Sequence, residues 1–181
     1  MRKIIILAVG VLLLAACHES AGQSESSAEQ NGEDIVQLVH EYSTGDFEDV
    51  SASITSNELI VTNADGEEKI YELPEDRFFL SIAPYIDETH PCTNHSLTGC
   101  QGEMPNESFD VEITDSEGNI VIAETMETLD NGFIDLWLPR NDDYEVMITY
   151  EGKTAEAILS TYDGDQTCIT TMQLEENSKE M

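Results

Sequence analysis

The side chains best suited to chemistry lie in one short stretch, from Thr89 to Gly102. This stretch contains Cys92 and Cys100, and two of the four histidines of the chain, His90 and His95. Thiolates and imidazoles are ligands for soft and borderline metal ions, and thiols also undergo redox reactions. The sequence therefore predicts that this loop binds a metal ion or is oxidised.

A third cysteine, Cys168, lies near the start of the last predicted strand. Setting Cys17 aside leaves an odd number of cysteines, so at most one intramolecular disulfide can form and one thiol remains. We expect the sulfurs of Cys92, Cys100 and Cys168 to converge on one point. The alternative is a Cys92–Cys100 disulfide that acts as a structural staple worth roughly 2.5 kcal/mol, with Cys168 unused.

The spacing of these cysteines differs from the Cys-x-x-Cys of thioredoxins and from the paired short spacings of zinc fingers. Three thiolates with imidazoles suit Cu(I), whereas zinc would accept three cysteines and a histidine equally well. The odd thiol favours copper, because two thiols can reduce Cu(II) by forming a disulfide while the third holds Cu(I). In an extended segment His90 and Cys92 point to the same side, about 6.6 Å apart. We therefore treat His90 and His95 as candidate copper ligands that could instead orient a neighbouring group.

The first residues are typical of an export signal. Arg2 and Lys3 precede an apolar run from Ile4 to Leu14, which is too short to span a bilayer permanently. Leu14-Ala15-Ala16-Cys17 looks like a lipobox, so residues 1–16 are predicted to be a lipoprotein signal peptide. We expect a lipid on Cys17 to anchor the chain to the membrane of a bacterial cell, outside the cytoplasm.

The formal net charge of −31 makes a nucleic-acid partner unexpected, because the surface would repel phosphates. An acidic surface does concentrate metal cations. Solubility in a salty or alkaline habitat is the favoured explanation of the charge, so the charge alone does not indicate a metal-binding protein.

Residues 17–33 are rich in Ser, Glu and Gln without an apolar period, which predicts a disordered acidic tether. Residues 34–75 are predicted to form a small unit of helix plus hairpin. Apolar residues recur with helical spacing over 33–43, and a second short helix is expected at 46–55. The Asp-Gly between Glu58–Thr62 and Lys69–Leu73 is typical of a hairpin turn.

Residues 76–174 contain short runs of alternating apolar residues, with turn signals about every ten residues. This pattern predicts an antiparallel β-sandwich-like domain that carries the Cys/His loop. Residues 175–181 are expected to be a polar tail. The whole chain is therefore predicted to be mostly β, with a small α+β N-terminal part.

Several strings of residues together resemble the CueP family of exported bacterial copper-resistance proteins. These strings are Ser81-Ile82-Ala83-Pro84-Tyr85, Thr89-His90-Pro91-Cys92, His95-Ser96-Leu97-Thr98-Gly99-Cys100-Gln101-Gly102-Glu103, Asn131-Gly132-Phe133-Ile134-Asp135-Leu136-Trp137-Leu138-Pro139-Arg140 and Thr167-Cys168-Ile169-Thr170-Thr171-Met172. The resemblance covers roughly residues 78–174, and it rests on long, unusual strings in register.

The resemblance implies that Cys92, Cys100 and Cys168 form the copper site and carry the thiol redox chemistry. It also implies a two-domain protomer whose smaller N-terminal part is used in dimerisation. The predicted lipid anchor departs from a freely soluble periplasmic form, which puts delivery of copper to a periplasmic partner in doubt. The remaining alternatives are a zinc-binding lipoprotein and a disulfide-stapled adhesion or docking module without metal. A stoichiometric scavenger that reduces Cu(II) with its thiols is favoured over a turnover enzyme.

Overall fold

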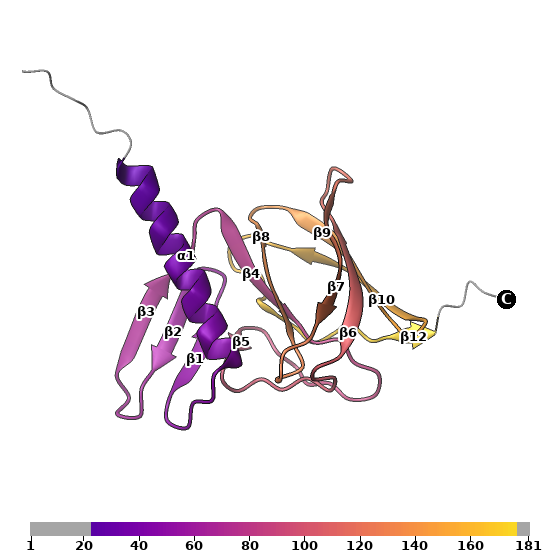
Figure 1. Cartoon of the computed structure of the whole chain (residues 1–181), viewed down its shortest axis with the longest axis horizontal. Coiled ribbons are helices and arrows are strands. Elements are labelled where there is room, and N and C mark those ends of the chain that lie inside the picture. The colour runs from indigo at the N-terminus through magenta and orange to yellow at the C-terminus, as the bar shows by residue number, and fades with distance from the viewer. Residues whose placement is uncertain (1–22, 177–181) are drawn as a thin grey trace, which may run out of the picture.

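The computed structural model describes residues 23–176, in which one helix is followed by short strands arranged in three sheets (Figure 1). The helix is α1 (Gln23–Thr44). The first sheet has the order β3 (Glu68–Glu72), β2 (Glu58–Thr62), β1 (Ser51–Ile54) and β5 (His95–Ser96). The second has the order β12 (Glu175–Glu176), β10 (Lys153–Ser160), β9 (Asp143–Tyr150), β6 (Ser108–Thr114) and β7 (Ile120–Glu127). The third has the order β11 (Cys168–Ile169), β4 (Arg77–Ile82) and β8 (Ile134–Pro139).

The molecule is mostly β with a small α+β N-terminal part, as the sequence predicts. In Figure 1 the helix α1 lies with β1, β2 and β3 on one side, and the longer strands lie on the other. The strand pairings within the sheets are antiparallel except that between β11 and β4, which is parallel. The predicted hairpin is confirmed, since β2 and β3 pair antiparallel around the turn that contains Gly66.

The strand β4 separates two hydrophobic cores. Phe78, Leu80 and Ile82 contribute to the larger core, which fills the β-rich part. Phe79 contributes to the smaller core beneath α1, where Val39 is also buried. Because successive side chains of a strand point to opposite faces, one buried strand can serve both cores. The third sheet therefore forms the wall between the two parts of the molecule.

Polar contacts also join the two parts. Arg140, which follows β8, donates hydrogen bonds to the backbone carbonyls of Arg77 and Ser56. Asp135 of β8 accepts hydrogen bonds from Ser43 at the end of α1 and from Ser81 of β4, both at 2.6 Å. Arg140 thus ties the segment after β1 to the wall, and Asp135 of β8 ties the end of α1 to it.

Three local expectations are wrong. The helix begins at Gln23, so residues 23–33 of the predicted tether are helical. Glu, Gln and Ala in that segment favour a helix even without an apolar stripe of their own. The expected second helix at 46–55 is replaced by β1, in which Ala52 and Ile54 alternate toward the core. Finally, Glu175 and Glu176 of the predicted tail form β12, which pairs with β10.

The predicted signal peptide, residues 1–16, and the predicted lipidation site, Cys17, lie outside the described residues. Within residues 23–176, no helix is both long enough and apolar enough to cross a membrane.

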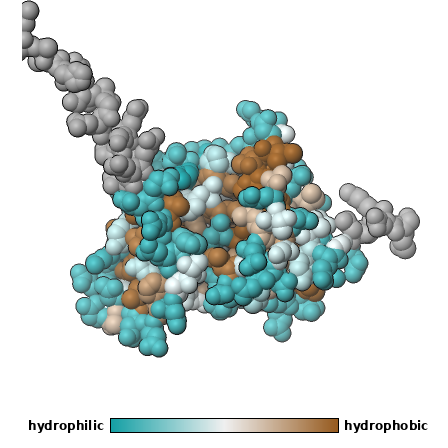
Figure 2. All heavy atoms as spheres, viewed as in Figure 1, coloured by the Kyte–Doolittle hydropathy of each residue, from teal (hydrophilic) through white to brown (hydrophobic). Residues whose placement is uncertain are grey.

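The surface seen in Figure 2 is largely hydrophilic, with a hydrophobic patch near the top of the β-rich part.

Candidate metal centre

The candidate site lies where three loops meet beside the wall. The long connection from β4 to β6, which includes β5, carries both histidines and two of the cysteines. The segment that leads into β11 carries Cys168. The turn before β8 carries Phe133, which forms a small buried cluster with Ala83 and Cys168. Cys92 and Cys100 pack against that cluster.

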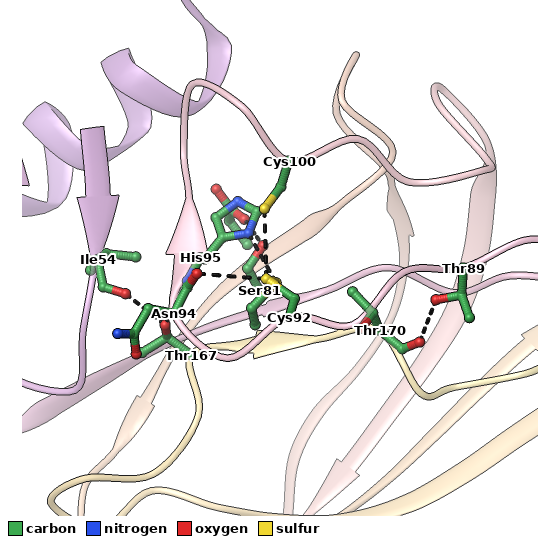
Figure 3. Close-up of a disulfide and its surroundings, with 11 residues drawn as sticks. Ile54, Ser81, Thr89, Cys92, Asn94, His95, Cys100, Thr167 and Thr170 are labelled. Atoms are coloured by element: carbon green, nitrogen blue, oxygen red, sulfur yellow. Dashed lines mark hydrogen bonds between the residues drawn. A yellow bond between two sulfur atoms is a disulfide. The ribbon is translucent and has the colours of Figure 1, made fainter. Parts of the chain in front are cut away.

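The three sulfurs converge, as the sequence predicts. Cys92 and Cys168 are joined by a disulfide, with their Cα atoms 5.6 Å apart, and the Sγ atom of Cys100 lies 3.6 Å from that of Cys92. Figure 3 shows the sulfur of Cys100 directed at this bond. The staple that the sequence left open, between Cys92 and Cys100, is not the disulfide present. Cys168 takes part because β11 pairs with β4, with Cys168 opposite Ser81.

His95 is held rigidly and is fully buried. It belongs to β5, which pairs with β1 so that His95 lies opposite Ile54. The centroid of its ring lies 4.5 Å from the ring centroid of Phe133. Its Nδ1 atom lies 3.5 Å from the Sγ atom of Cys168. Its Nε2 atom is buried and has no hydrogen-bond partner among the described residues. A buried polar atom without a partner is costly, and a metal ion would relieve that cost.

Burial also sets the charge of this histidine. Loss of solvent, helped by the neighbouring His90, lowers the pKa of His95 from 6.5 to about 4. The ring is therefore neutral near pH 7, which is the form that donates a lone pair to a metal ion. His95 is thus a suitable ligand in both location and protonation state.

Two groups of ligand atoms overlap at Cys100. In each group the atoms lie within 4.8 Å of one another. One group is His90, Cys92 and Cys100, which are all partly exposed. The other is His95, Cys100 and Cys168, of which His95 and Cys168 are buried. Once the Cys92–Cys168 disulfide is reduced, thiolate and imidazole donors at this spacing fit Cu(I), which is a soft ion.

The Cys100 thiol is half-buried, and its loop is fixed by close backbone contact. Burial raises the pKa of Cys100, although a backbone hydrogen bond with Ser96 partly offsets the rise. Two residues later, the N–H of Gly102 donates to the carbonyl of Asn131 at 2.7 Å. A Cβ atom on Gly102 would lie 2.6 Å from the carbonyl oxygen of Gly132, so only glycine permits this approach.

The segment before Cys92 is anchored at two points. The Glu103 carboxylate accepts hydrogen bonds from the backbone N–H groups of Ile86, Asp87 and Glu88, at 2.6 to 3.2 Å. The hydroxyl of Thr89 donates to the carbonyl of Thr170 at 2.5 Å. These bonds hold the His90–Cys92 segment against the loops that carry the other two cysteines.

Sequence reasoning assigns no role to Glu103, Phe133 or Thr167, although all three lie in the strings that resemble CueP. Thr167 is fully buried beside Cys168, and its hydroxyl bonds to both β5 and β1. Its position directly before Cys168 is the one local signal that could have indicated it. Met104 and Met172 lie in the larger core.

The comparisons with known proteins identify the family of this chain. The sequence profile of a family described as "Periplasmic copper-binding protein CueP" matches residues 34–173. A solved structure described as the crystal structure of S.CueP is 41% identical, with a TM-score of 0.72. The match covers 86% of this chain and 99% of that one. None of the curated proteins compared with the chain matches it significantly. The chain therefore belongs to the CueP family of periplasmic copper-binding proteins.

Proposed function

We propose that this protein is a membrane-anchored lipoprotein that captures copper through Cys92, Cys100 and Cys168, reduces Cu(II) to Cu(I), and holds the product. The observation that carries the proposal is the convergence of three sulfurs beside His95, whose buried Nε2 atom has no hydrogen-bond partner within residues 23–176. Copper binding is the property of the family. The role of each residue, the reduction and the anchor are our inferences.

The two overlapping ligand groups suit the capture of an ion from solvent. The partly exposed group of His90, Cys92 and Cys100 is accessible from outside. The group that contains His95 and Cys168 lies deeper and shares Cys100 with the first. Thiolates bind Cu(I) more favourably than Cu(II), so donors of this kind stabilise the reduced ion.

The thiols also supply the electrons. When Cys92 and Cys168 form their disulfide, they release two electrons and two protons. Each Cu(II) ion takes one electron, so one disulfide accounts for two Cu(I) ions. Cys100 and the histidines remain to hold copper. Reduction ends after one round unless an external thiol reduces the disulfide, so the protein acts as a scavenger rather than a turnover enzyme.

The anchor and the oligomeric state complete the proposal. A lipid on Cys17 would keep the site at the bacterial cell membrane, outside the cytoplasm. Homodimerisation through the N-terminal part, residues 34–75, follows from the family resemblance. It is supported by the edge position of β3, where Ile70 is 57% exposed. An edge strand with an exposed apolar residue is a natural site for pairing with a second copy.

The test is to mix the fully reduced protein with Cu(II) and a Cu(I)-specific chromophore in the absence of oxygen. We expect the wild type to yield Cu(I) and to form the Cys92–Cys168 disulfide. A triple variant, Cys92→Ser, Cys100→Ser and Cys168→Ser, should yield none, while Cys17→Ser should match the wild type. No signal from the wild type, or a full signal from the triple variant, would contradict the proposed reduction.

A further inference from the structure

The Cys92 sulfur has a potential partner on each side. It is bonded to Cys168, and the Sγ atom of Cys100 lies at contact distance, 3.6 Å away. The two partners differ in access to solvent, because Cys168 is 1% exposed whereas Cys100 is only half-buried. Cys92 is itself partly exposed. The same central sulfur can therefore be shared between a buried bond and a more exposed one.

We propose that the disulfide migrates between these two partners by thiol–disulfide exchange. The Cys100 thiolate attacks the Cys92 sulfur, the Cys92–Cys100 bond forms, and the Cys92–Cys168 bond breaks with Cys168 leaving as a thiolate. One disulfide and one thiol are present before and after, so no oxidant or reductant is needed. The proton that Cys100 gives up to solvent is regained by Cys168. The exchange needs no metal, and only its place in copper handling rests on the proposed function.

The surroundings of Cys168 suit a leaving thiolate. The Nδ1 atom of His95 lies 3.5 Å from its sulfur, so the tautomer with the proton on Nδ1 donates a hydrogen bond to it. The neighbouring backbone is fixed, since the N–H groups of Thr167 and Cys168 both donate to the carbonyl of Thr93. Cys168 can therefore be released without displacement of its strand.

Migration changes what an external thiol can reach. In the Cys92–Cys168 form one sulfur of the disulfide is buried, so a reductant has access from the Cys92 side alone. In the Cys92–Cys100 form both sulfurs belong to partly exposed residues. Exchange rates depend on access to the attacked sulfur. The exchange therefore presents the oxidised site to its reductant, a thiol or dithiol molecule of the cell envelope, with Cys100 as the resolving cysteine.

The direct test uses the oxidised, metal-free full chain with Cys17→Ser, so that three cysteines remain. After incubation with a chelator, the chain is quenched in acid, unfolded and alkylated, and the alkylated cysteine is identified by peptide mass spectrometry. We expect the label to appear on Cys168 as well as on Cys100, in a ratio that becomes constant with time. A label found on Cys100 alone at all times would overturn the proposal.

A second measurement is the rate of reduction by glutathione. Cys100→Ser locks the Cys92–Cys168 bond, and we expect it to be reduced about tenfold more slowly than the wild type. Cys168→Ser locks the Cys92–Cys100 bond and should be reduced at least as fast as the wild type. Equal rates for the two locked variants would overturn the role of Cys100. These two tests are independent of the chromophore assay, which measures copper reduction by the reduced wild type. The disulfide can migrate in a protein that does not reduce copper, and copper can be reduced by a protein whose disulfide does not migrate.

Discussion

The hydroxyl of Thr167 accepts a hydrogen bond from the backbone N–H of His95, with Oγ1 and N 3.0 Å apart. The same hydroxyl donates to the carbonyl of Ile54 at 2.7 Å. The backbone N–H of Thr167 bonds to the loop at Thr93, and its carbonyl accepts from Ser81 of β4. One buried residue therefore joins β1, β5 and β4 immediately before Cys168, and it fixes His95 relative to the sulfurs.

Replacing this hydroxyl should loosen the site. Thr167→Val keeps the shape of the side chain but leaves the His95 N–H and the Ile54 carbonyl without their partner. Buried groups left unsatisfied cost about 1–3 kcal/mol, so we expect a loss of unfolding free energy in that range and weaker Cu(I) binding. Denaturant unfolding and competition with a Cu(I) chelator measure the two effects. Thr167→Ser retains the hydroxyl and should lie much closer to the wild type; equal losses in both variants would point to packing instead.

Glu103 should control the order of the segment that leads to His90 and Cys92. Glu103→Gln replaces one carboxylate oxygen by an NH₂ group, which faces backbone N–H donors and cannot accept their hydrogen bonds. We expect a loss of about 1–2 kcal/mol, because hydrogen bonds to charged groups are among the stronger ones. Hydrogen exchange of the backbone amides at residues 86–88 should become faster in this variant.

A matched control is Glu117→Gln, which makes the same chemical change in the exposed turn between β6 and β7. It should leave both the exchange of residues 86–88 and the copper affinity unchanged. If Glu103→Gln protected these amides as well as the wild type does, the anchoring role would be refuted.

The sequence was sufficient for most features that depend on local pattern, although β1 was predicted to be part of a helix. Alternating apolar residues predicted the strands, and the Asp-Gly turn predicted the β2–β3 hairpin. The convergence of Cys168 with the loop cysteines was predicted from the odd thiol count and from the position of Cys168 on the last strand. Residues 23–33 were wrongly predicted to be disordered because they lack an apolar period, although their Glu, Gln and Ala residues favour a helix.

Other features could not be predicted because they depend on contacts between distant segments. The choice of Cys168 as partner of Cys92 follows from the parallel pairing of β11 with β4, which no local pattern indicates. The burial of His95 follows likewise from the pairing of a two-residue strand with β1. The sequence alone left both histidines as equal candidates, and the structure distinguishes them by burial.

Asp135 should make stability depend on pH. Burial raises its pKa, and the hydrogen bonds from Ser43 and Ser81 and the charge of His40 only partly oppose the rise. The folded state therefore binds this proton more tightly than the unfolded state. Unfolding free energy should fall as the pH rises from the ordinary aspartate value, about 3.9, through the raised pKa.

Asp135→Asn removes the titrating group while keeping an oxygen acceptor and a donor for the two serine hydroxyls. We expect this variant to lose that downward slope and to be more stable than the wild type at neutral pH. Denaturant unfolding across an acidic to neutral pH series provides the measurement. A wild-type slope that persists unchanged in Asp135→Asn would exclude Asp135 as its source.

His95 should give the unfolding free energy a pH dependence opposite to that from Asp135. A variant at this position should also change copper binding and stability in different ways. Its pKa falls from 6.5 to about 4 on folding, so the unfolded state binds the proton more tightly between these values. The stability contributed by the neutral ring is present above pH 6.5 and is lost as the pH falls toward 4, by about 3 kcal/mol at most. His95→Phe removes this loss on acidification.

The same variant also removes the buried Nε2 atom, which has no hydrogen-bond partner in the part of the chain that the structure describes. The new ring would lie among Phe79 and Phe133, so we expect His95→Phe to unfold at the same or higher denaturant concentration at neutral pH. Its Cu(I) affinity should nevertheless drop at least tenfold, because an imidazole ligand is lost. His90→Phe, in the partly exposed group, is the matched comparison and should leave the acid dependence of stability intact. Wild-type Cu(I) affinity in His95→Phe would show that the ring packs beside the copper ion without binding it.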